Sequence, residues 1–188
     1  ILSPSSANSL VGLKPTTGSL SRTGVVPISS SLDTVGPMAR SVADVVTLFN
    51  AMVGYDPKDT AMPLISADMQ LLYREISLTD KRLGALGLYV DNNLYQNALS
   101  LLSENAAVIV DIDFQVERHP RFSELLGGEM GRDLALYLED RSSDQIEIDS
   151  ITSLREFNNR DPDTRAPYGQ ALIDMMVELN LTEDKLEQ

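Results

Sequence analysis

The sequence has no cysteine and no tryptophan, and its 188 residues include a single histidine. Without cysteine, the chain forms no disulfide, no thiolate metal site and no cysteine nucleophile. The one imidazole, at His119, supplies neither a histidine-based triad nor a two-histidine metal site. His119 precedes Pro120 in a predicted loop, where a surface position is the favoured interpretation. We therefore expect no metal and no other cofactor.

Positive charge and long apolar runs are also scarce. The chain carries 15 Lys and Arg residues against 28 Asp and Glu, a formal net charge of −13. This balance argues against direct binding to nucleic acid and to anionic membranes, which both require clustered basic residues. No apolar run approaches the roughly 20 residues that span a bilayer. The segment Ile1–Pro4 lacks the pattern of a secretory signal. The compartment stays open, with the cytoplasm favoured over a secreted or periplasmic location.

The opening segment, Ile1 to Leu32, has few charges but many hydroxyl groups. Lys14 and Arg22 are its only charged residues, whereas Ser and Thr recur along its whole length. One interpretation is a flexible low-complexity linker. The other is an irregular buried segment whose side chains bond to its own backbone. Short apolar inserts such as Val25-Val26 favour the buried segment, because linkers rarely space aliphatic residues between turn residues.

A helix is well marked after this segment. Ser41 and Asp44 have the spacing of a capping box, in which the serine oxygen meets a free backbone N–H. Apolar residues then recur on one helical face as far as Val53. Gly54 is the predicted C-cap.

Residues 82–113 have the pattern of one βαβ unit. A first strand, apolar on both faces, is predicted over 82–90, and a β-branched second strand over 107–112. The helix between them has an apolar stripe of Leu94, Ala98, Leu101 and Leu102. Two buried strands joined by a helical crossover should be parallel and right-handed.

The rest of the chain is predicted to be helical. Helices are predicted to begin at Pro120, at a capping box of Ser153 with Glu156, at Pro167 and at Thr182. Gly127 and Gly128 weaken the first of these, and a polar loop is predicted over 158–166. The predicted fold class is therefore α/β.

Few residues carry chemistry. Asp111, Asp113 and Glu117 lack the oxygen spacing and the central glycine of a calcium loop, so a solvated strand end is favoured. The glycine-containing runs lack the Gly-Lys-Ser/Thr of a phosphate loop. The sequon at 180–182 matters only in a secreted protein. Lys14 is the only base candidate in the opening segment, and beside Pro15 it is interpreted as structural.

Three runs of the sequence carry a family resemblance. They are Ser-Ala-Asn-Ser-Leu-Val-Gly-Leu-Lys-Pro-Thr at 6–16, Ser-Arg-Thr-Gly-Val-Val-Pro at 21–27, and Asp-Thr-Val-Gly-Pro-Met-Ala-Arg-Ser-Val-Ala-Asp at 33–44. In this order and at this separation, they resemble the stretch that follows the nucleophile in amidase-signature enzymes. The resemblance is strong over residues 1–59 and continues through 82–113. It weakens beyond 120, and residues 154–179 are most similar to the peptide amidase branch.

The resemblance implies a large mixed α/β sheet and a serine nucleophile. In this family the nucleophile works with a second serine, bonded through a cis peptide, and with a lysine base. The family pattern Gly-Gly-Ser-Ile-x-x-Pro matches Ile1–Pro4 in its last four positions. This register puts the nucleophile immediately before Ile1, and the glycines, bridging serine and lysine further upstream. Serines near the start of the chain are not the nucleophile in this register: Ser3, Ser5 and Ser6. Ile1 and Leu2 are the candidate substrate-lining residues.

One departure from the family pattern bears on the substrate. Many members carry arginine two positions after the nucleophile, where a guanidinium holds a carboxylate. This sequence has Leu2, which predicts a neutral or apolar substrate group. The predicted function is hydrolysis of a carboxamide C–N bond in a small molecule or peptide, C-terminal peptide amides included. The alternatives are the A subunit of a glutamyl-tRNA amidotransferase and a non-catalytic module on the same scaffold.

The resemblance also sets the expected extent of the chain. Residues 1–188 are expected to be one partial amidase domain, with a signature segment at 1–59, a βαβ region at 60–120 and a helical region at 121–188. Without the triad, such a piece is expected to be inactive by itself. The last strands of the family sheet are expected to follow Gln188. Exposed strand edges and apolar faces then predict marginal stability or self-association.

Overall fold

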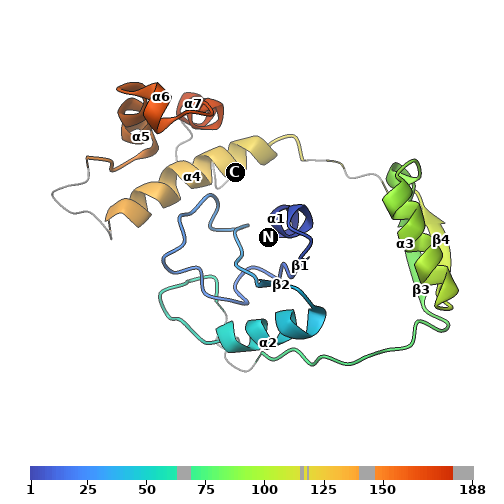
Figure 1. Cartoon of the computed structure of the whole chain (residues 1–188). Coiled ribbons are helices and arrows are strands. Elements are labelled where there is room, and N and C mark those ends of the chain that lie inside the picture. The colour runs from blue at the N-terminus through green and yellow to red at the C-terminus, as the bar shows by residue number, and fades with distance from the viewer. Residues whose placement is uncertain (63–68, 115–116, 118, 140–146, 180–188) are drawn as a thin grey trace. The chain divides into compact units, whose positions relative to one another are not determined.

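The computed structural model describes residues 1–62, 69–114, 117, 119–139 and 147–179. The chain forms two compact units (Figure 1). Unit 1 comprises Ile1–Leu72 and Pro120–Gln188, and unit 2 comprises Tyr73–His119. The helix predicted at Thr182 and the sequon at 180–182 lie outside the described residues. No helix in the described ranges is long and apolar enough to cross a bilayer.

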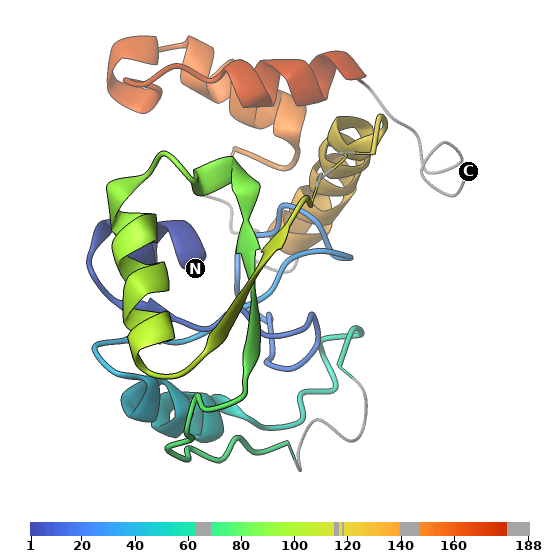
Figure 2. The ribbon, with the colours of Figure 1, turned by 90° about the vertical axis from the view of Figure 1, so that its right-hand side faces the viewer.

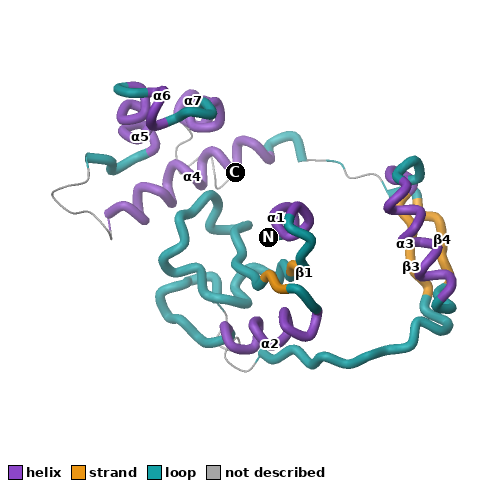
Figure 3. Tube along the Cα trace, viewed as in Figure 1, coloured by secondary structure: helices purple, strands orange, loops and turns teal. Residues whose placement is uncertain are grey.

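Unit 1 contains six helices and two short strands among its described residues. They are α1 (Leu2–Ala7), β1 (Val11–Gly12), β2 (Met38–Ala39), α2 (Val42–Met52), α4 (Phe122–Glu139), α5 (Ile151–Asn159), α6 (Pro162–Arg165) and α7 (Ala171–Leu179). β1 and β2 pair antiparallel, with Val11 opposite Ala39. Most of the chain between β1 and β2 is irregular (Figure 3).

This irregular segment is buried at several points, as the second of the two interpretations predicted. Ser19 and Ser29 are 5% and 0% exposed, and Leu20 is 2% exposed. Their neighbours in the chain form hydrogen bonds with distant residues, which a flexible linker does not do. The segment is therefore ordered and buried in part, but Val25 and Val26, which favoured the buried interpretation, are 46% and 59% exposed.

Helix α2 begins where the capping pattern predicts. The Ser41 hydroxyl accepts the Asp44 backbone N–H at 3.1 Å, and the same hydroxyl donates to the Asp44 carboxylate at 2.8 Å. On the inner face, Val45 and Phe49 are 3% and 1% exposed. The C-cap is Val53 with extended backbone, and not Gly54 as predicted.

The helices of the C-terminal region gather on one side of α4 (Figures 1 and 2). Gly127 lies in the middle of α4, where a glycine weakens a helix by about 1 kcal/mol relative to alanine. Its lack of a side chain is used here, because a Cβ at Gly127 would lie 3.0 Å from Leu179 Cδ1 of α7. The glycine therefore lets the two helices approach closely.

The start of α5 differs from the prediction. Its N-cap is Ser150, and Ser153 is the third helical residue. The Ser150 hydroxyl accepts the Ser153 backbone N–H at 3.2 Å, and the Ser153 hydroxyl accepts the Ser150 backbone N–H at 3.0 Å. This reciprocal pair does what a serine and a glutamate do in a capping box, so the helix starts three residues earlier.

Helix α6 occupies part of the predicted polar loop. Pro162 sits at its first position, where the fixed φ of proline suits a helix start. Pro167 was predicted to open the next helix, but α7 begins only at Ala171. Tyr168, which precedes α7, is fully exposed.

Unit 2 contains β3 (Arg82–Leu86), a 3-10 turn η2 (Gly87–Tyr89), α3 (Asn93–Glu104) and β4 (Val108–Ile112). β3 and β4 are parallel, with Arg82 opposite Val108, which confirms the predicted parallel pair. β3 is shorter than predicted. It ends at Leu86, where η2 begins, and the hydroxyl of Tyr95 accepts the Leu86 backbone N–H at 2.7 Å.

Three of the four residues of the apolar stripe predicted for α3 are exposed, and only Leu102 faces inward. Leu94 and Leu101 are 80% and 60% exposed. The side that packs toward the strands carries Tyr95 and Leu102, which are half-buried. The helix is apolar on more than one face, and the bond from Leu86 to the Tyr95 hydroxyl selects which face turns inward.

Replacing Ala106 with glycine is expected to stabilise unit 2 by about 1 kcal/mol. Ala106 has a φ of 67°, a left-handed conformation that costs an alanine but not a glycine. Its N–H bonds to the Ser103 carbonyl, and the next N–H, of Ala107, bonds to the Leu102 carbonyl, as in a Schellman motif. Urea unfolding would measure the change. Ala98→Gly, exposed in mid-helix, is the control and should destabilise; loss of stability in both variants would contradict the prediction.

Candidate active-site region

The first residue of the chain is held through its carbonyl group. The Ile1 carbonyl accepts the Ser5 backbone N–H at 3.0 Å and the Ser5 hydroxyl at 2.8 Å. Ser5 is 3% exposed, so this pair of bonds lies inside the protein. The residue from which α1 starts is therefore fixed by two donors from one serine.

The side chain of Ile1 is held by two glycines. A Cβ at Gly12 would lie 3.3 Å from Ile1 Cγ2, and a Cβ at Gly36 would lie 2.8 Å from Ile1 Cδ1. At Gly36 it would also lie 2.0 Å from the Leu13 carbonyl oxygen, so no larger residue fits there without moving the backbone. Ile1 therefore packs inward, whereas Leu2, the other candidate lining residue, is 56% exposed. Their contact with a substrate stays a prediction.

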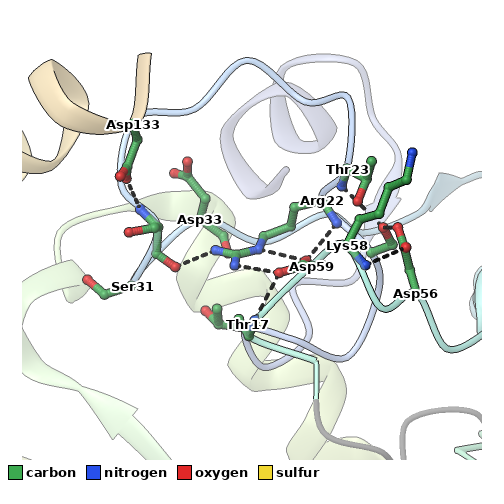
Figure 4. Close-up of polar contacts among 12 residues, drawn as sticks. Thr17, Arg22, Thr23, Ser31, Asp33, Asp56, Lys58, Asp59 and Asp133 are labelled. Atoms are coloured by element: carbon green, nitrogen blue, oxygen red, sulfur yellow. Dashed lines mark hydrogen bonds and ion pairs between the residues drawn. The ribbon is translucent and has the colours of Figure 1, made fainter. Parts of the chain in front are cut away.

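A buried ion pair lies elsewhere in the same unit (Figure 4). The Arg22 guanidinium donates to both oxygens of Asp59, from Nε at 3.0 Å and from Nη2 at 2.8 Å. The Arg22 backbone N–H adds a third bond at 2.9 Å. The side chains are 13% and 4% exposed. Hydrogen bonding from Arg22 lowers the pKa of Asp59 to about 2, and the same bond raises the pKa of Arg22.

The same guanidinium closes the loop of residues 27–33. Arg22 Nη1 donates to the Ser30 carbonyl at 2.5 Å and more weakly to the Asp33 carbonyl at 3.4 Å. The Asp33 carboxylate accepts the backbone N–H groups of Ile28 and Ser29 at 2.8 and 2.9 Å. The loop is thus bonded both to Arg22 and to itself.

Helix α4 holds this loop from the opposite side. The buried carboxylate of Glu129 accepts the hydroxyls of Ser29 and Ser31, the second at 2.8 Å. One turn further along, Asp133 accepts the Ser30 backbone N–H at 2.7 Å (Figure 4). Glu129 and Asp133 are 7% and 8% exposed. Three successive serines are therefore bonded to two acidic residues of one helix.

A hollow of about 580 Å³ lies between the loop, the turn at 56–60 and α4. Its volume falls within the range of ligand sites. Its charged walls include Arg22, Asp33, Asp59 and Asp133, whose side chains all bond to protein groups. Lys58 and the hydroxyl residues Thr23, Ser30 and Thr60 also line it.

This network was not predicted from the sequence. Arg22 is one of only two charged residues in a long segment that otherwise carries no charge, and that isolation was the available signal. Asp59 and Glu129 carried no signal, because neither forms a motif with its sequence neighbours. In the ranges that the structure describes, no three His, Cys, Asp or Glu side chains are grouped to hold a metal ion. His119 is exposed, as interpreted.

Comparison with known proteins shows which family the chain resembles. The family described as Amidase matches residues 1–173. A probable amidase of Arabidopsis thaliana is 36% identical over 149 residues, which cover 76% of the chain and 28% of that protein. The A chain of the glutamyl-tRNA(Gln) amidotransferase of Zymomonas mobilis is 35% identical over 127 residues, 63% of this chain and 26% of that protein. The chain thus spans less than a third of either relative.

Two solved structures are similar along nearly the whole chain. An amidase family protein from Bacillus anthracis has a TM-score of 0.78 and 30% identity, and the match covers 100% of this chain and 38% of that one. The native peptide amidase of Stenotrophomonas maltophilia has a TM-score of 0.66 and 28% identity, with coverage of 92% and 37%. The predicted α/β class and the predicted family are both confirmed, and the chain belongs to the amidase family.

Proposed function

We propose that the full-length protein carrying this chain hydrolyses a carboxamide C–N bond with a serine placed immediately before Ile1. The observation that carries the proposal is the family match over residues 1–173, combined with an opening Ile1–Pro4 that fits the family pattern after the nucleophile. The two bonds at the Ile1 carbonyl support it, because a nucleophile needs a fixed attachment point.

The reaction follows from the chemistry of an activated serine. Its oxygen attacks the amide carbon, the C–N bond breaks, and the leaving nitrogen departs as ammonia after accepting a proton. Water then hydrolyses the acyl-serine ester and releases the acid. A base and oxyanion donors are required. In the family they are a lysine, with a bridging serine, and backbone N–H groups before the nucleophile.

For the substrate we propose a peptide or small-molecule amide with a neutral or apolar group near the scissile bond. Leu2 stands where many family members carry arginine, and its side chain is 56% exposed, so it offers an apolar contact to an incoming group. Similarity to the Stenotrophomonas maltophilia peptide amidase supports a peptide amide. Ile1 contributes through its backbone, whose carbonyl Ser5 holds.

A second candidate is the A subunit of a glutamyl-tRNA amidotransferase, favoured by the 35% identity to the Zymomonas mobilis protein. Such a protein releases ammonia for a partner active site. A third is a non-catalytic module on the amidase scaffold. Glutaminase activity that rises on addition of the other amidotransferase chains would favour the second. Lack of hydrolysis by the full-length protein would favour the third, and the 188-residue chain alone is expected to be inactive.

The proposed nucleophile is tested by replacing the serine before Ile1 with alanine in the full-length protein. Removal of a nucleophile is expected to lower kcat on a peptide amide by about 10⁴-fold or more. Ammonia release measures the rate. Ser3→Ala is the matched control, because Ser3 is an exposed serine two residues into the chain. Equal rates for wild type and the nucleophile variant would overturn the proposal.

The role of Leu2 is tested by Leu2→Arg. The guanidinium is expected to raise kcat/KM for a carboxylate-bearing amide, relative to an apolar amide, by about 10-fold or more, since a charge-assisted bond is worth about 1.5–3 kcal/mol. Leu2→Met keeps an apolar side chain and should leave the preference unchanged. An unaltered preference in the arginine variant would show that residue 2 does not contact the substrate.

A further inference from the structure

We propose that Ser5 is a positioning residue for the nucleophile: it holds the Ile1 carbonyl and thereby sets where the residue before Ile1 lies. The inference rests on the proposed function, because it takes the serine before Ile1 as the nucleophile. Ser5 itself does not touch the substrate in this proposal. It acts through one peptide unit.

The Ile1 carbonyl accepts two hydrogen bonds from Ser5. In a helix start, the Ser5 backbone N–H alone would satisfy the Ile1 carbonyl, and it does bond there at 3.0 Å. The Ser5 hydroxyl adds a second donor at 2.8 Å. A carbonyl oxygen has two lone pairs. With both occupied by one buried residue, the plane of the Ile1 carbonyl is fixed.

The Ser5 hydroxyl is itself closely packed. Serine hydroxyls in helices often bond to the carbonyl four residues back, which by itself indicates no function. Here the hydroxyl is also confined from the other side, because a Cβ at Gly12 would lie only 2.2 Å from Ser5 Oγ. Gly12 belongs to β1, which pairs with β2. The hydroxyl therefore lies between α1 and β1, against a position where only a glycine leaves room for it.

The Ile1 side chain is held independently, by its packing against Gly36. A Cβ there would lie 2.8 Å from Ile1 Cδ1, so the methyl packs where only a glycine leaves room. With side chain and carbonyl both held, the backbone nitrogen of Ile1 has little freedom. The Cα of the preceding residue lies one trans peptide away, about 3.8 Å from the Ile1 Cα, so its position is restricted as well.

Restriction of this kind matters for attack on an amide. A misplacement of about 1 Å can cost about 10²-fold in rate, because attack needs the reacting atoms aligned at close approach. Loss of the hydroxyl alone leaves the backbone bond and the Gly36 contact in place. We therefore expect a smaller effect from Ser5→Ala, about a 10-fold fall in kcat.

The test uses full-length protein with Ser5→Ala, Ser6→Ala and the nucleophile variant, assayed on one peptide amide. Active sites are titrated with a serine-directed fluorophosphonate, so that kcat is given per competent site. The expected result for Ser5→Ala is a roughly 10-fold lower kcat per site with KM within about twofold. Ser6→Ala, in the same helix but exposed, should match wild type. Ser5→Cys places a weaker donor on a somewhat larger side chain, gives a second measurement if the alanine variant folds poorly, and should also lose kcat per site.

The outcomes separate the two proposals. Wild-type kcat per site in both Ser5 variants would overturn the positioning role while leaving the proposed function intact. A loss confined to the number of titratable sites would mean that Ser5 only supports folding, and would likewise overturn it. Full activity of the nucleophile variant would overturn the proposed function and the positioning role together.

Discussion

Replacing Arg22 with leucine is expected to destabilise unit 1 by about 3–5 kcal/mol, since it leaves a buried carboxylate without its charged partner. Asp59 is 7% exposed and receives two guanidinium bonds, at 2.8 and 3.0 Å. The variant also removes the donors to the Ser30 and Asp33 carbonyls. Urea unfolding at neutral pH, followed by circular dichroism, measures the loss.

The same variant should alter how stability depends on pH. The folded pKa of Asp59 is about 2, below its ordinary 3.8. A lowered pKa stabilises the fold above the unfolded value and loses that effect as pH falls through the folded value. The wild type should therefore lose about 2 kcal/mol from this group between about pH 4 and pH 2. Arg22→Leu lacks the side-chain hydrogen bonds that lower the pKa of Asp59. The difference in the free energy of unfolding between wild type and this variant should therefore become smaller as the pH falls.

Arg121→Leu is the matched control. Arg121 pairs with Glu124 at 2.9 Å, but both side chains are largely exposed, at 49% and 43%. Exposed pairs of this kind contribute about 0–1 kcal/mol. The control should therefore unfold almost as wild type does at every pH. A deficit in Arg22→Leu that is small, or that stays constant from about pH 6 to about pH 3, would contradict the account of the Arg22–Asp59 pair.

The elements that could be predicted are those decided by short-range signals. The start of α2 depends on Ser41 and Asp44, three residues apart, and its buried face on a repeat within the same helix. The parallel pair of β3 and β4 follows from two apolar runs joined by a helix, a connection with few alternatives. In the first case the residues that fix the structure lie within one helical turn, and in the second they lie in consecutive elements of one unit.

The errors arise where the sequence offers two equivalent choices. Ser150 and Ser153 both have capping ability, and the reciprocal bonds between them select the earlier start. Helix α3 has apolar residues on more than one face, and one bond to Tyr95 selects the inner one. The polar network lay beyond prediction because its partners are distant: Arg22 and Asp59 are 37 residues apart, and Ser29 and Glu129 are 100 apart.

Replacing Glu129 with leucine is expected to destabilise unit 1 by about 2–3 kcal/mol. Ser29 is 0% exposed, and its hydroxyl donates to the Glu129 carboxylate. A leucine offers no acceptor, and a buried donor without an acceptor costs about 1–3 kcal/mol. The Ser31 hydroxyl loses its 2.8 Å bond to the same oxygen, which adds a smaller cost. Urea unfolding measures the sum.

The pattern of the loss distinguishes a local anchor from general damage to α4. Glu129→Gln keeps an acceptor oxygen, so it should recover more than half of the stability that Glu129→Leu loses. Glu124→Leu, at a half-exposed position of the same helix, should change stability by less than about 0.5 kcal/mol. Hydrogen exchange should rise at the amides of Ser30 and Ser31 in the leucine variant alone, because Glu129 holds that loop to the helix. Equal losses in the glutamine and leucine variants would show that the negative charge of Glu129, and not its acceptor oxygen, holds Ser29 and Ser31.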